Sequence, residues 1–203
     1  MHLQKVYYCI KFYMNREGYM NFGKKIISIV FIVVIGVFFY RQQQLDGICD
    51  MNYERDFSAI ENLFHKGDNW YWMISDYSRK VGFSLEFMLK NKTSSQHLKL
   101  HDLITKVLYV EGKLAGFIGY YPKSPYTWQF LFLLVDQDFR GKGFAKQLLK
   151  YAVDDMVHRG AIKIDLVTRV DNARSQGLYQ KFGFKKTGET EEHVLMAWRK
   201  DQG

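Results

Sequence analysis

The sequence predicts an α/β (α+β) fold in which helices cover both faces of a mixed, mostly antiparallel central sheet. Two observations support this prediction, and a third adds a helix before the domain. Apolar residues make up 47% of the 203 residues and charged residues 25%, which suits a chain with a substantial core and excludes a disordered one. From residue 53 onward, helical and extended hydrophobic patterns alternate in the order α-α-β-β-β-α-β-α-β-β. An apolar segment at residues 26–40 predicts an N-terminal hydrophobic helix ahead of this domain.

The N-terminal segment 1–41 is expected to be a basic flank with a membrane anchor. Its apolar part, residues 26–40, contains no charged side chain, and residues 20–40 together reach the roughly 20 residues that span a bilayer. Segment 1–41 also holds +5 of the chain's net charge of +8. Because only +3 is left for the rest of the chain, a nucleic-acid partner is not expected.

The folded domain is expected to cover residues 53–203, after a short polar linker at 42–52. Its first predicted helix is Tyr53–His65, where apolar residues recur at helical spacing. The second predicted helix is the shorter Ser84–Leu89, for which Ser84 is a suitable N-cap.

Three extended stretches follow these helices. Lys106–Val110 and Leu114–Tyr121 flank the turn Glu111-Gly112-Lys113, which is a hairpin signal. The third stretch, Thr127–Val135, is almost entirely apolar, as expected of a strand that is covered on both faces. Two prolines, Pro122 and Pro125, bound the turn before it.

The last third of the domain alternates between helix and strand. Apolar residues from Phe144 to Val157 repeat every three or four positions, which predicts a helix that ends near Gly160. The elements predicted after it are the strand Ala161–Thr168, the helix Asn172–Phe182, and the closing strands Phe184–Thr187 and Val194–Trp198.

The segment 131–149 contains the motif with the most chemical information. A strand runs into the turn Arg140-Gly141-Lys142-Gly143 and then directly into a helix. Glycines allow close approach of the backbone to a ligand, and the first amides of a helix have no intrahelical acceptors, so an anion such as a pyrophosphate suits this turn. Lys146 stands where a dinucleotide fingerprint needs its third glycine, and no Gly-Lys-Ser/Thr of a Walker loop follows.

Two motifs resemble those of the GNAT superfamily of N-acetyltransferases. Arg140-x-x-Gly143-x-Ala145, after an apolar strand, is similar to the family's acyl-CoA signature Gln/Arg-x-x-Gly-x-Gly/Ala. The block NARSQGLYQKFGF at residues 172–184 resembles the family's Asn…Leu-Tyr…Gly-Phe block. The resemblance covers about residues 51–200 and implies the acyl-CoA N-acyltransferase fold, with acetyl-CoA as the acyl donor.

The resemblance also implies a binding site for acetyl-CoA. The donor would lie between the strands Thr127–Val135 and Ala161–Thr168, which splay apart. Its pantetheine arm would pair with the first of these strands and its pyrophosphate would sit on the glycine turn. The residues implied to contact acetyl-CoA are Leu133, Leu134, Val135, Arg140, Gly141, Lys142, Gly143, Phe144, Ala145 and Asn172.

The implied reaction is direct attack of a primary amine on the thioester, through a tetrahedral intermediate. Tyr179 occupies the family's general-acid position and Asn172 lies two helical turns before it, although Asn172 is equally suited to be a helix N-cap. Many relatives carry a glutamate on the central strand where this chain has Gln129, so Asp136, His101, Glu86 or a water chain remain open as the base. A non-catalytic acyl-CoA-binding module is the alternative function.

No metal site is expected. The six histidines show no metal-binding spacing and the two cysteines, Cys9 and Cys49, form no CxxC motif. The acceptor and the oligomeric state are left open.

The expected location balances two opposing arguments. The basic residues before the apolar segment place the domain outside the cytoplasm by the positive-inside rule, whereas acetyl-CoA is expected inside. We expect a single-pass membrane protein with a cytoplasmic catalytic domain, or a soluble cytoplasmic protein if translation starts at Met51.

Overall fold

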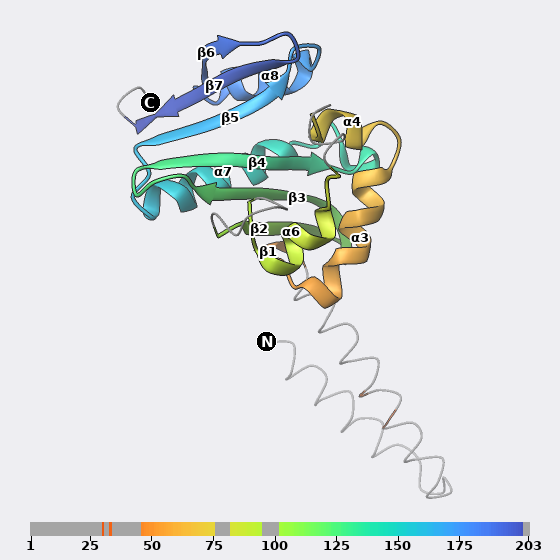
Figure 1. Cartoon of the computed structure of the whole chain (residues 1–203). Coiled ribbons are helices and arrows are strands. Elements are labelled where there is room, and N and C mark those ends of the chain that lie inside the picture. The colour runs from red at the N-terminus through yellow and green to blue at the C-terminus, as the bar shows by residue number, and fades with distance from the viewer. Residues whose placement is uncertain (1–29, 31–32, 34–45, 76–81, 95–101, 201–203) are drawn as a thin grey trace, which may run out of the picture. The chain divides into compact units, whose positions relative to one another are not determined.

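The computed structural model of the chain describes residues 46–75, 82–94 and 102–200, together with Val30 and Val33 (Figure 1). The chain divides into two compact units, Met1–Asp46 and Gly47–Gly203. All of the strands and helices discussed below belong to the second unit.

The second unit is built on one seven-stranded sheet with the strand order β1-β2-β3-β4-β5-β7-β6. Every pair of neighbouring strands is antiparallel except β4 and β5, which are parallel. The mixed, mostly antiparallel sheet predicted from the sequence is therefore confirmed. The strands are β1 (Gly47–Asp50), β2 (Ile104–Val110), β3 (Lys113–Pro122), β4 (Thr127–Val135), β5 (Lys163–Arg169), β6 (Lys185–Glu189) and β7 (His193–Arg199).

Helices lie on both faces of this sheet, as predicted. In Figure 1, α3 and α6 lie on the face nearer the viewer and α7 lies behind the sheet. Asn52 is the N-cap of α3 and Ser84 is the N-cap of α6, where their side chains accept hydrogen bonds from Arg55 N and Phe87 N. The helices are α3 (Tyr53–His65), α4 (Asn69–Met73), α6 (Leu85–Asn91), α7 (Phe144–His158) and α8 (Ala173–Lys181).

The predicted linker 42–52 is wrong in part, because Gly47–Asp50 forms the edge strand β1. This strand pairs antiparallel with β2, and Lys106 of β2 holds Asp50 of β1 in a 2.6 Å ion pair. Four residues are too few to show a strand periodicity, which is why the sequence pattern missed this element. A chain that started at Met51 would lack β1 altogether.

The expected location as a single-pass membrane protein is also corrected. Within the described part of the chain, no helix combines the length and the apolar character needed to cross a bilayer. The segment proposed as the anchor and as the N-terminal hydrophobic helix, residues 20–40, lies outside the described residues apart from Val30 and Val33.

A bulge in β4 decides which faces its aromatic side chains cover. Gly119 of β3 pairs with Phe132, but the next residue, Tyr120, pairs with Phe130, so Leu131 is an extra residue in β4. Because the pleat alternates, a bulge of one residue turns its two neighbours to opposite faces. Phe132 accordingly contacts Phe64 of α3, with ring centroids 6.2 Å apart.

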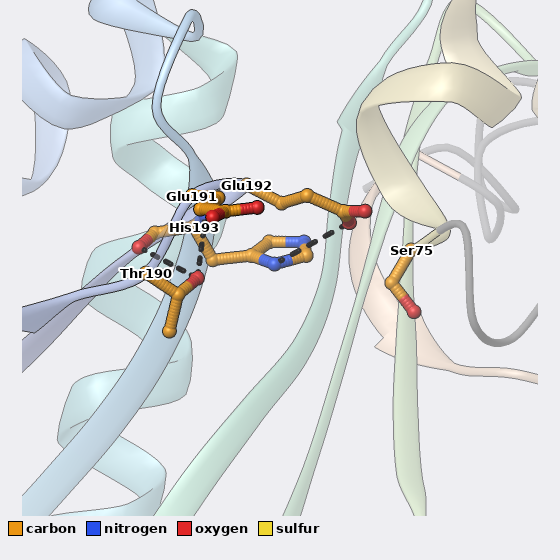
Figure 2. A pocket seen from close by; sticks show the side chains of 5 residues that line it. All are labelled: Ser75, Thr190, Glu191, Glu192 and His193. Carbon is orange, nitrogen blue, oxygen red and sulfur yellow. Dashed lines mark hydrogen bonds and ion pairs between the residues drawn. The ribbon is translucent and has the colours of Figure 1, made fainter.

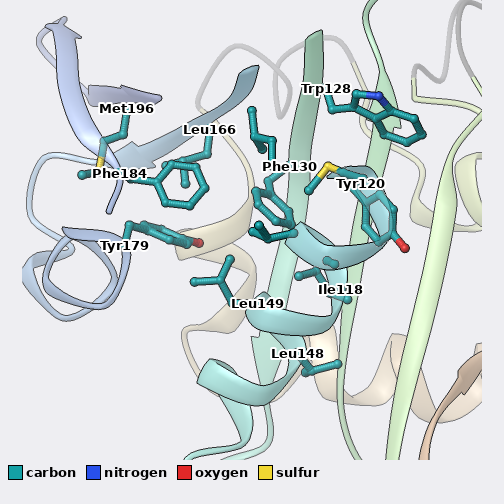
Figure 3. Packing of buried hydrophobic residues seen from close by; sticks show 14 of the residues in the cluster. Ile118, Tyr120, Trp128, Phe130, Leu148, Leu149, Leu166, Tyr179, Phe184 and Met196 are labelled. Carbon is teal, nitrogen blue, oxygen red and sulfur yellow. The ribbon is translucent and has the colours of Figure 1, made fainter. Parts of the chain in front are cut away.

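Phe130 joins the main core on the other face of the sheet. That core is formed largely by side chains of the central strands, α7 and α8, including Leu149, Tyr179 and Phe184 (Figure 3). The ring centroids of Phe130 and Phe184 are 6.1 Å apart, and those of Tyr179 and Phe184 are 5.8 Å apart. The aromatic side chains around the bulge thus connect the central strands to the C-terminal part of the domain.

The bulge also marks the place where β4 and β5 separate. These two strands pair only from Thr127↔Lys163 to Gln129↔Asp165. A bulge bends its strand and interrupts the ladder, and here the interruption falls directly after Gln129. Among the described residues, the rest of β4, Phe130–Val135, has no strand partner on the β5 side, and we call it the unpaired β4 edge.

A buried carboxylate connects α3 to the start of the sheet. Asp56 is 0% exposed, and it accepts hydrogen bonds from the Tyr109 hydroxyl at 2.6 Å and from the Asn52 amide at 2.8 Å. It also pairs with the Arg55 guanidinium. Burial alone would raise the pKa of Asp56, but these hydrogen bonds favour the charged form more strongly and lower it.

Replacing this carboxylate should weaken the fold. Because Asp56→Ala leaves the Tyr109 hydroxyl and the Arg55 guanidinium without their buried acceptor, we expect the free energy of unfolding to fall by about 2–3 kcal/mol. Urea denaturation measures this change. Glu61→Ala, on an exposed position of the same helix, is the matched control and should change stability by less than about 0.5 kcal/mol.

The pH dependence of stability provides a second test of this prediction. Since the pKa of Asp56 is lowered in the folded state, its contribution is fully present above the unfolded-state value of about 4 and is lost as the pH falls through the folded-state value. The stability of Asp56→Asn should therefore fall less steeply than that of the wild type below about pH 4. Parallel curves for the two proteins would contradict this account.

Candidate active site

The glycine turn lies between the C-terminal end of β4 and α7. The short 3-10 helix Gln137–Phe139 leads into it, and α7 begins directly after Gly143. Gly141 and Gly143 have φ values of 80° and 85°, a conformation that other residues rarely adopt. A Cβ atom placed on either glycine would meet no other atom within 4 Å, so there is open space in front of the turn.

This open space has the features of an anion site. α7 has no side-chain cap because its N-cap is Gly143, so its first amides are not satisfied by a capping side chain. These amides carry the positive end of the helix dipole. The turn predicted to bind a pyrophosphate therefore fits such a group in geometry and in charge.

Arg140 is held by the protein on two sides. Its Nε donates to the Val135 carbonyl at 3.1 Å, and its Nη2 donates to Asn69 Oδ1 at 2.7 Å. Burial and the nearby positive charge of Arg174 lower the pKa of Arg140, and Asp136 opposes them in part. An anion between the two guanidinium groups would remove their repulsion, which makes Arg174 a further candidate that the sequence motif did not indicate.

Lys142 and Lys66, which both lie near the turn, differ in their availability. Lys142 is exposed, and its Nζ lies 5.4 Å from the centroid of the Phe139 ring. Lys66 of the α3–α4 connection is instead occupied by Asp136 at 2.7 Å and Asp138 at 3.3 Å. The exposed side chain of Lys142 is therefore available to pair with an anion that binds at the turn.

The residues predicted to pair with a pantetheine arm, Leu133, Leu134 and Val135, lie on the unpaired β4 edge. Such an edge offers backbone groups to an extended ligand as a missing strand would. The Val135 carbonyl is already engaged by Arg140.

Two other residues of the predicted set mainly support the turn. Phe144 and Ala145 are partly buried and pack against the main core. The Phe144 ring contacts Phe139 with a centroid distance of 6.2 Å. Their side chains therefore fix the first turn of α7 to the core, which leaves the backbone amides as the groups that face a ligand.

Asn172 and Tyr179 lie at opposite ends of α8. Asn172 is the N-cap, with Oδ1 accepting from Ser175 N at 3.1 Å, so the capping role considered from the sequence is the one observed. Tyr179 is 9% exposed, and burial raises its pKa to about 12. Its hydroxyl points from α8 toward Phe130 and Leu149 (Figure 3).

The candidates for a general base are accounted for in different ways. Asp136 pairs with Lys66 and caps the short 3-10 helix by accepting from Asp138 N. The carboxylate of Glu86 accepts from the Tyr53 hydroxyl at 3.1 Å, and the Gln129 amide donates to the Phe130 carbonyl at 3.2 Å. His101 lies outside the described residues.

An open pocket of about 480 Å³ lies beside the turn between β6 and β7. It is lined by Ser75, Thr190, Glu191, Glu192 and His193, and Figure 2 shows the Glu192 side chain extending toward Ser75. Glu192 and His193 form an ion pair at 3.8 Å when the histidine is protonated. His193 pairs with Arg169, so the pocket lies at the end of the sheet where β5 ends. Within the described ranges, no three His, Cys, Asp or Glu side chains cluster as metal ligands.

The helix α4 contributes two residues that the sequence reasoning overlooked. The Asn69 side chain is 2% exposed and donates to the Leu63 carbonyl at 2.8 Å while it accepts from Arg140. The Tyr71 hydroxyl donates to Asp171 at 2.9 Å and accepts from Arg169 at 3.0 Å. The aromatic run Trp70-Tyr71-Trp72 was the available signal, but five residues are too short for a helical periodicity.

The sequence matches the model of the Acetyltransferase (GNAT) family over residues 58–184. Human N-acetyltransferase 8B is 30% identical over 130 residues, which is 62% of this chain and 57% of the human protein. The chain thus spans less than two thirds of that relative's length.

Solved structures share the fold. The ribosomal-protein-S18-alanine N-acetyltransferase of Escherichia coli has a TM-score of 0.56 at 18% identity, over 75% of this chain and 92% of that one. The PaiA N-acetyltransferase of Thermoplasma acidophilum, solved in complex with coenzyme A, has a TM-score of 0.55 at 20% identity, over 75% and 97%.

The conformation of the glycine turn predicts that replacing two glycines by alanine changes the free energy of unfolding in opposite directions. Gly143→Ala forces an alanine into the left-handed region and should lower the free energy of unfolding by about 1 kcal/mol. Gly177→Ala, where the added methyl group also meets no atom within 4 Å but the backbone is helical, should raise it by about 0.5–1 kcal/mol. Denaturant titration of both variants checks the pair, and an equal effect of the two would contradict the assigned role of the turn.

Proposed function

Because the chain belongs to the Acetyltransferase (GNAT) family, we propose that it transfers the acetyl group of acetyl-CoA to a primary amine. The observation that carries this proposal is the unpaired β4 edge, which leads directly into the glycine turn at the start of α7. An extended ligand with a pyrophosphate at one end matches a strand edge followed by an anion site.

In this proposal, the pantetheine arm pairs with backbone groups of the segment Leu133, Leu134 and Val135 other than the Val135 carbonyl, which accepts from Arg140. The amides from Gly141 to Ala145 receive the pyrophosphate, and Lys142 and Arg140 add positive charge beside it. Acetyl-CoA supplies the activated thioester when it is bound. The chain's own contribution is then to orient this thioester and to place proton donors and acceptors around it.

The chemistry joins the amine nitrogen to the thioester carbonyl carbon while the C–S bond breaks. One proton must leave the nitrogen, and the departing sulfur gains a hydrogen bond or a proton. Tyr179 is the proposed donor to the sulfur, because its hydroxyl points into the core at the unpaired β4 edge and burial keeps it protonated. Asn172 supports this donor from the N-terminal end of α8.

The acceptor is proposed to approach through the pocket at the β6–β7 turn. Its lining includes the carboxylates of Glu191 and Glu192, which favour a ligand that arrives as an ammonium ion. The relative from Escherichia coli is named for acetylating the alanine of a ribosomal protein. For the present chain we propose only the class of a primary amine, on a small molecule or a protein.

The alternative is a binding module that holds acyl-CoA without turnover. It is favoured by the residue at position 129 of the central strand. This residue is Gln129, whereas many family members carry a glutamate there. Comparing acetyl-CoA binding with release of free thiol across a panel of amines separates the two functions, because the module would bind but release no thiol above the uncatalysed rate.

Binding of the donor is the first expected result. Calorimetric titration of the full-length protein with acetyl-CoA should give saturable binding with a Kd below about 1 mM, the upper end of ordinary KM values. Inorganic phosphate should compete, since both anions would use the glycine turn. Absence of heat with acetyl-CoA at that concentration would refute the proposed function.

The second expected result concerns Tyr179. Tyr179→Phe removes the hydroxyl but keeps the buried ring, so kcat should fall by about 10²-fold while the calorimetric Kd for acetyl-CoA is retained. Tyr126→Phe removes a hydroxyl from a side chain that is 63% exposed and should leave both quantities unchanged. Wild-type turnover in Tyr179→Phe would remove this residue from the reaction.

A further inference from the structure

We propose that Tyr71 of α4 is a positioning residue. It holds α8, and with it Tyr179, at a fixed position relative to the glycine turn at which the donor is proposed to bind. This inference rests on the proposed function and extends it to a helix that carries no family motif. Its basis is a set of contacts by which α4 reaches the ends of both β4 and β5, the two strands that separate after Gln129.

The first group of contacts joins α4 to the end of β4. Asn69 accepts from Arg140, and Arg140 donates to the Val135 carbonyl, so one buried amide and one guanidinium connect α4 to the last residue of the strand. The same Asn69 side chain donates to Leu63 of α3. The N-terminal end of α4 is therefore fixed to the donor-binding side of the domain.

The second group joins α4 to the end of β5. The Arg169 guanidinium lies 4.0 Å from the centroid of the Tyr71 ring, and its Nη2 donates to the Tyr71 hydroxyl. That hydroxyl in turn donates to Asp171. Figure 1 shows α4 beside the C-terminal ends of β4 and β5, which agrees with these contacts.

Tyr71 gives the Arg169 guanidinium both a ring contact and a hydrogen-bond acceptor. Arg169 is 8% exposed, and its Nε and Nη1 atoms are buried without a hydrogen-bond partner among the described residues. The nearest carboxylate oxygen, on Asp171, is 3.6 Å from Nε. Because a buried guanidinium with unsatisfied donors is costly, loss of the Tyr71 hydroxyl should shift both Arg169 and Asp171.

A shift at this point is transmitted to Tyr179 through rigid structure. Asp171 directly precedes Asn172, the N-cap of α8, and the Gln176 amide donates to the carbonyls of Arg169 and Val170 at 3.0 and 2.9 Å. The end of β5, the turn and the first turn of α8 thus form one hydrogen-bonded unit. Tyr179 lies on the same nine-residue helix.

The two groups of contacts have different consequences for the reaction. The donor is proposed to bind on β4 and α7, whereas Tyr179 belongs to the part of the domain that follows β5. Releasing Tyr71 changes the position of Tyr179 relative to the bound donor but leaves the donor site itself in place. The turnover number should therefore fall without a matching change in affinity for acetyl-CoA.

The test uses Tyr71→Phe in the full-length protein, with Tyr126→Phe as the matched control. We expect kcat to fall about tenfold and the calorimetric Kd for acetyl-CoA to stay within about twofold of the wild type. In a Tyr179→Phe background, Tyr71→Phe should cause no further loss of kcat, since its effect acts through Tyr179. The thermal midpoint of each variant is measured alongside.

Contrary results separate the positioning role from the proposed function. Unchanged kcat in Tyr71→Phe, a lowered thermal midpoint alone, or an equal loss in the Tyr179→Phe background overturns the positioning role. Wild-type turnover in Tyr179→Phe overturns it as well. Failure of the wild-type protein to bind acetyl-CoA refutes the proposed function itself, and this is read from the wild type before any variant is compared.

Discussion

The extra residue Leu131 in β4 is the constraint on which the rest of the domain depends. With it, the strand ceases to follow β5 after Gln129 and turns Phe130 and Phe132 toward opposite faces of the sheet. One core is thereby connected to α3 and the other to α7 and α8. Within the part of the chain that the structure describes, the backbone beyond the bulge has no strand partner on one side, although hydrophobic layers cover both of its faces. A strand edge of this kind is costly in an ordinary sheet, and a ligand that completes it offsets that cost.

A sheet that opens at one end needs other contacts to fix the distance between its two parts. The core around Phe130, Tyr179 and Phe184 supplies apolar contact across the opening, but apolar contact has little directional preference. The polar contacts of α4 fix the relative orientation of the two parts. The Arg140 and Arg169 guanidinium groups donate hydrogen bonds to α4, and these bonds form only when the partner lies at a suitable distance and angle. This combination explains why a five-residue helix with no motif of its own connects the ends of two strands.

The sequence predicted the elements whose pattern is long or whose chemistry is local. The stripe of α7, the apolar strand β4 and the glycine turn were recognisable because each repeats a period or requires a residue type over several positions. The edge strand β1 and the helix α4 were not, since four and five residues are too short for a period. The partners of Asn69 and Tyr71 were also beyond reach of the sequence, because they lie 71, 98 and 100 residues away along the chain. Asn172 was placed correctly as a possible N-cap, since capping depends on neighbours within one turn.

The pKa of Tyr179 restricts what this residue can do. Burial raises it to about 12, well above the value of about 8.5 for an ordinary thiol. Complete transfer of its proton to a departing thiolate would therefore be unfavourable. A hydrogen bond to the sulfur requires no such transfer, and in a dry core it is stronger than in water. Tyr179 is thus better suited to donate a hydrogen bond to the developing negative charge than to act as a full proton donor, and such a bond depends strongly on distance and angle. A residue that works in this way needs exact placement more than acidity, which is the demand that the contacts of α4 can meet.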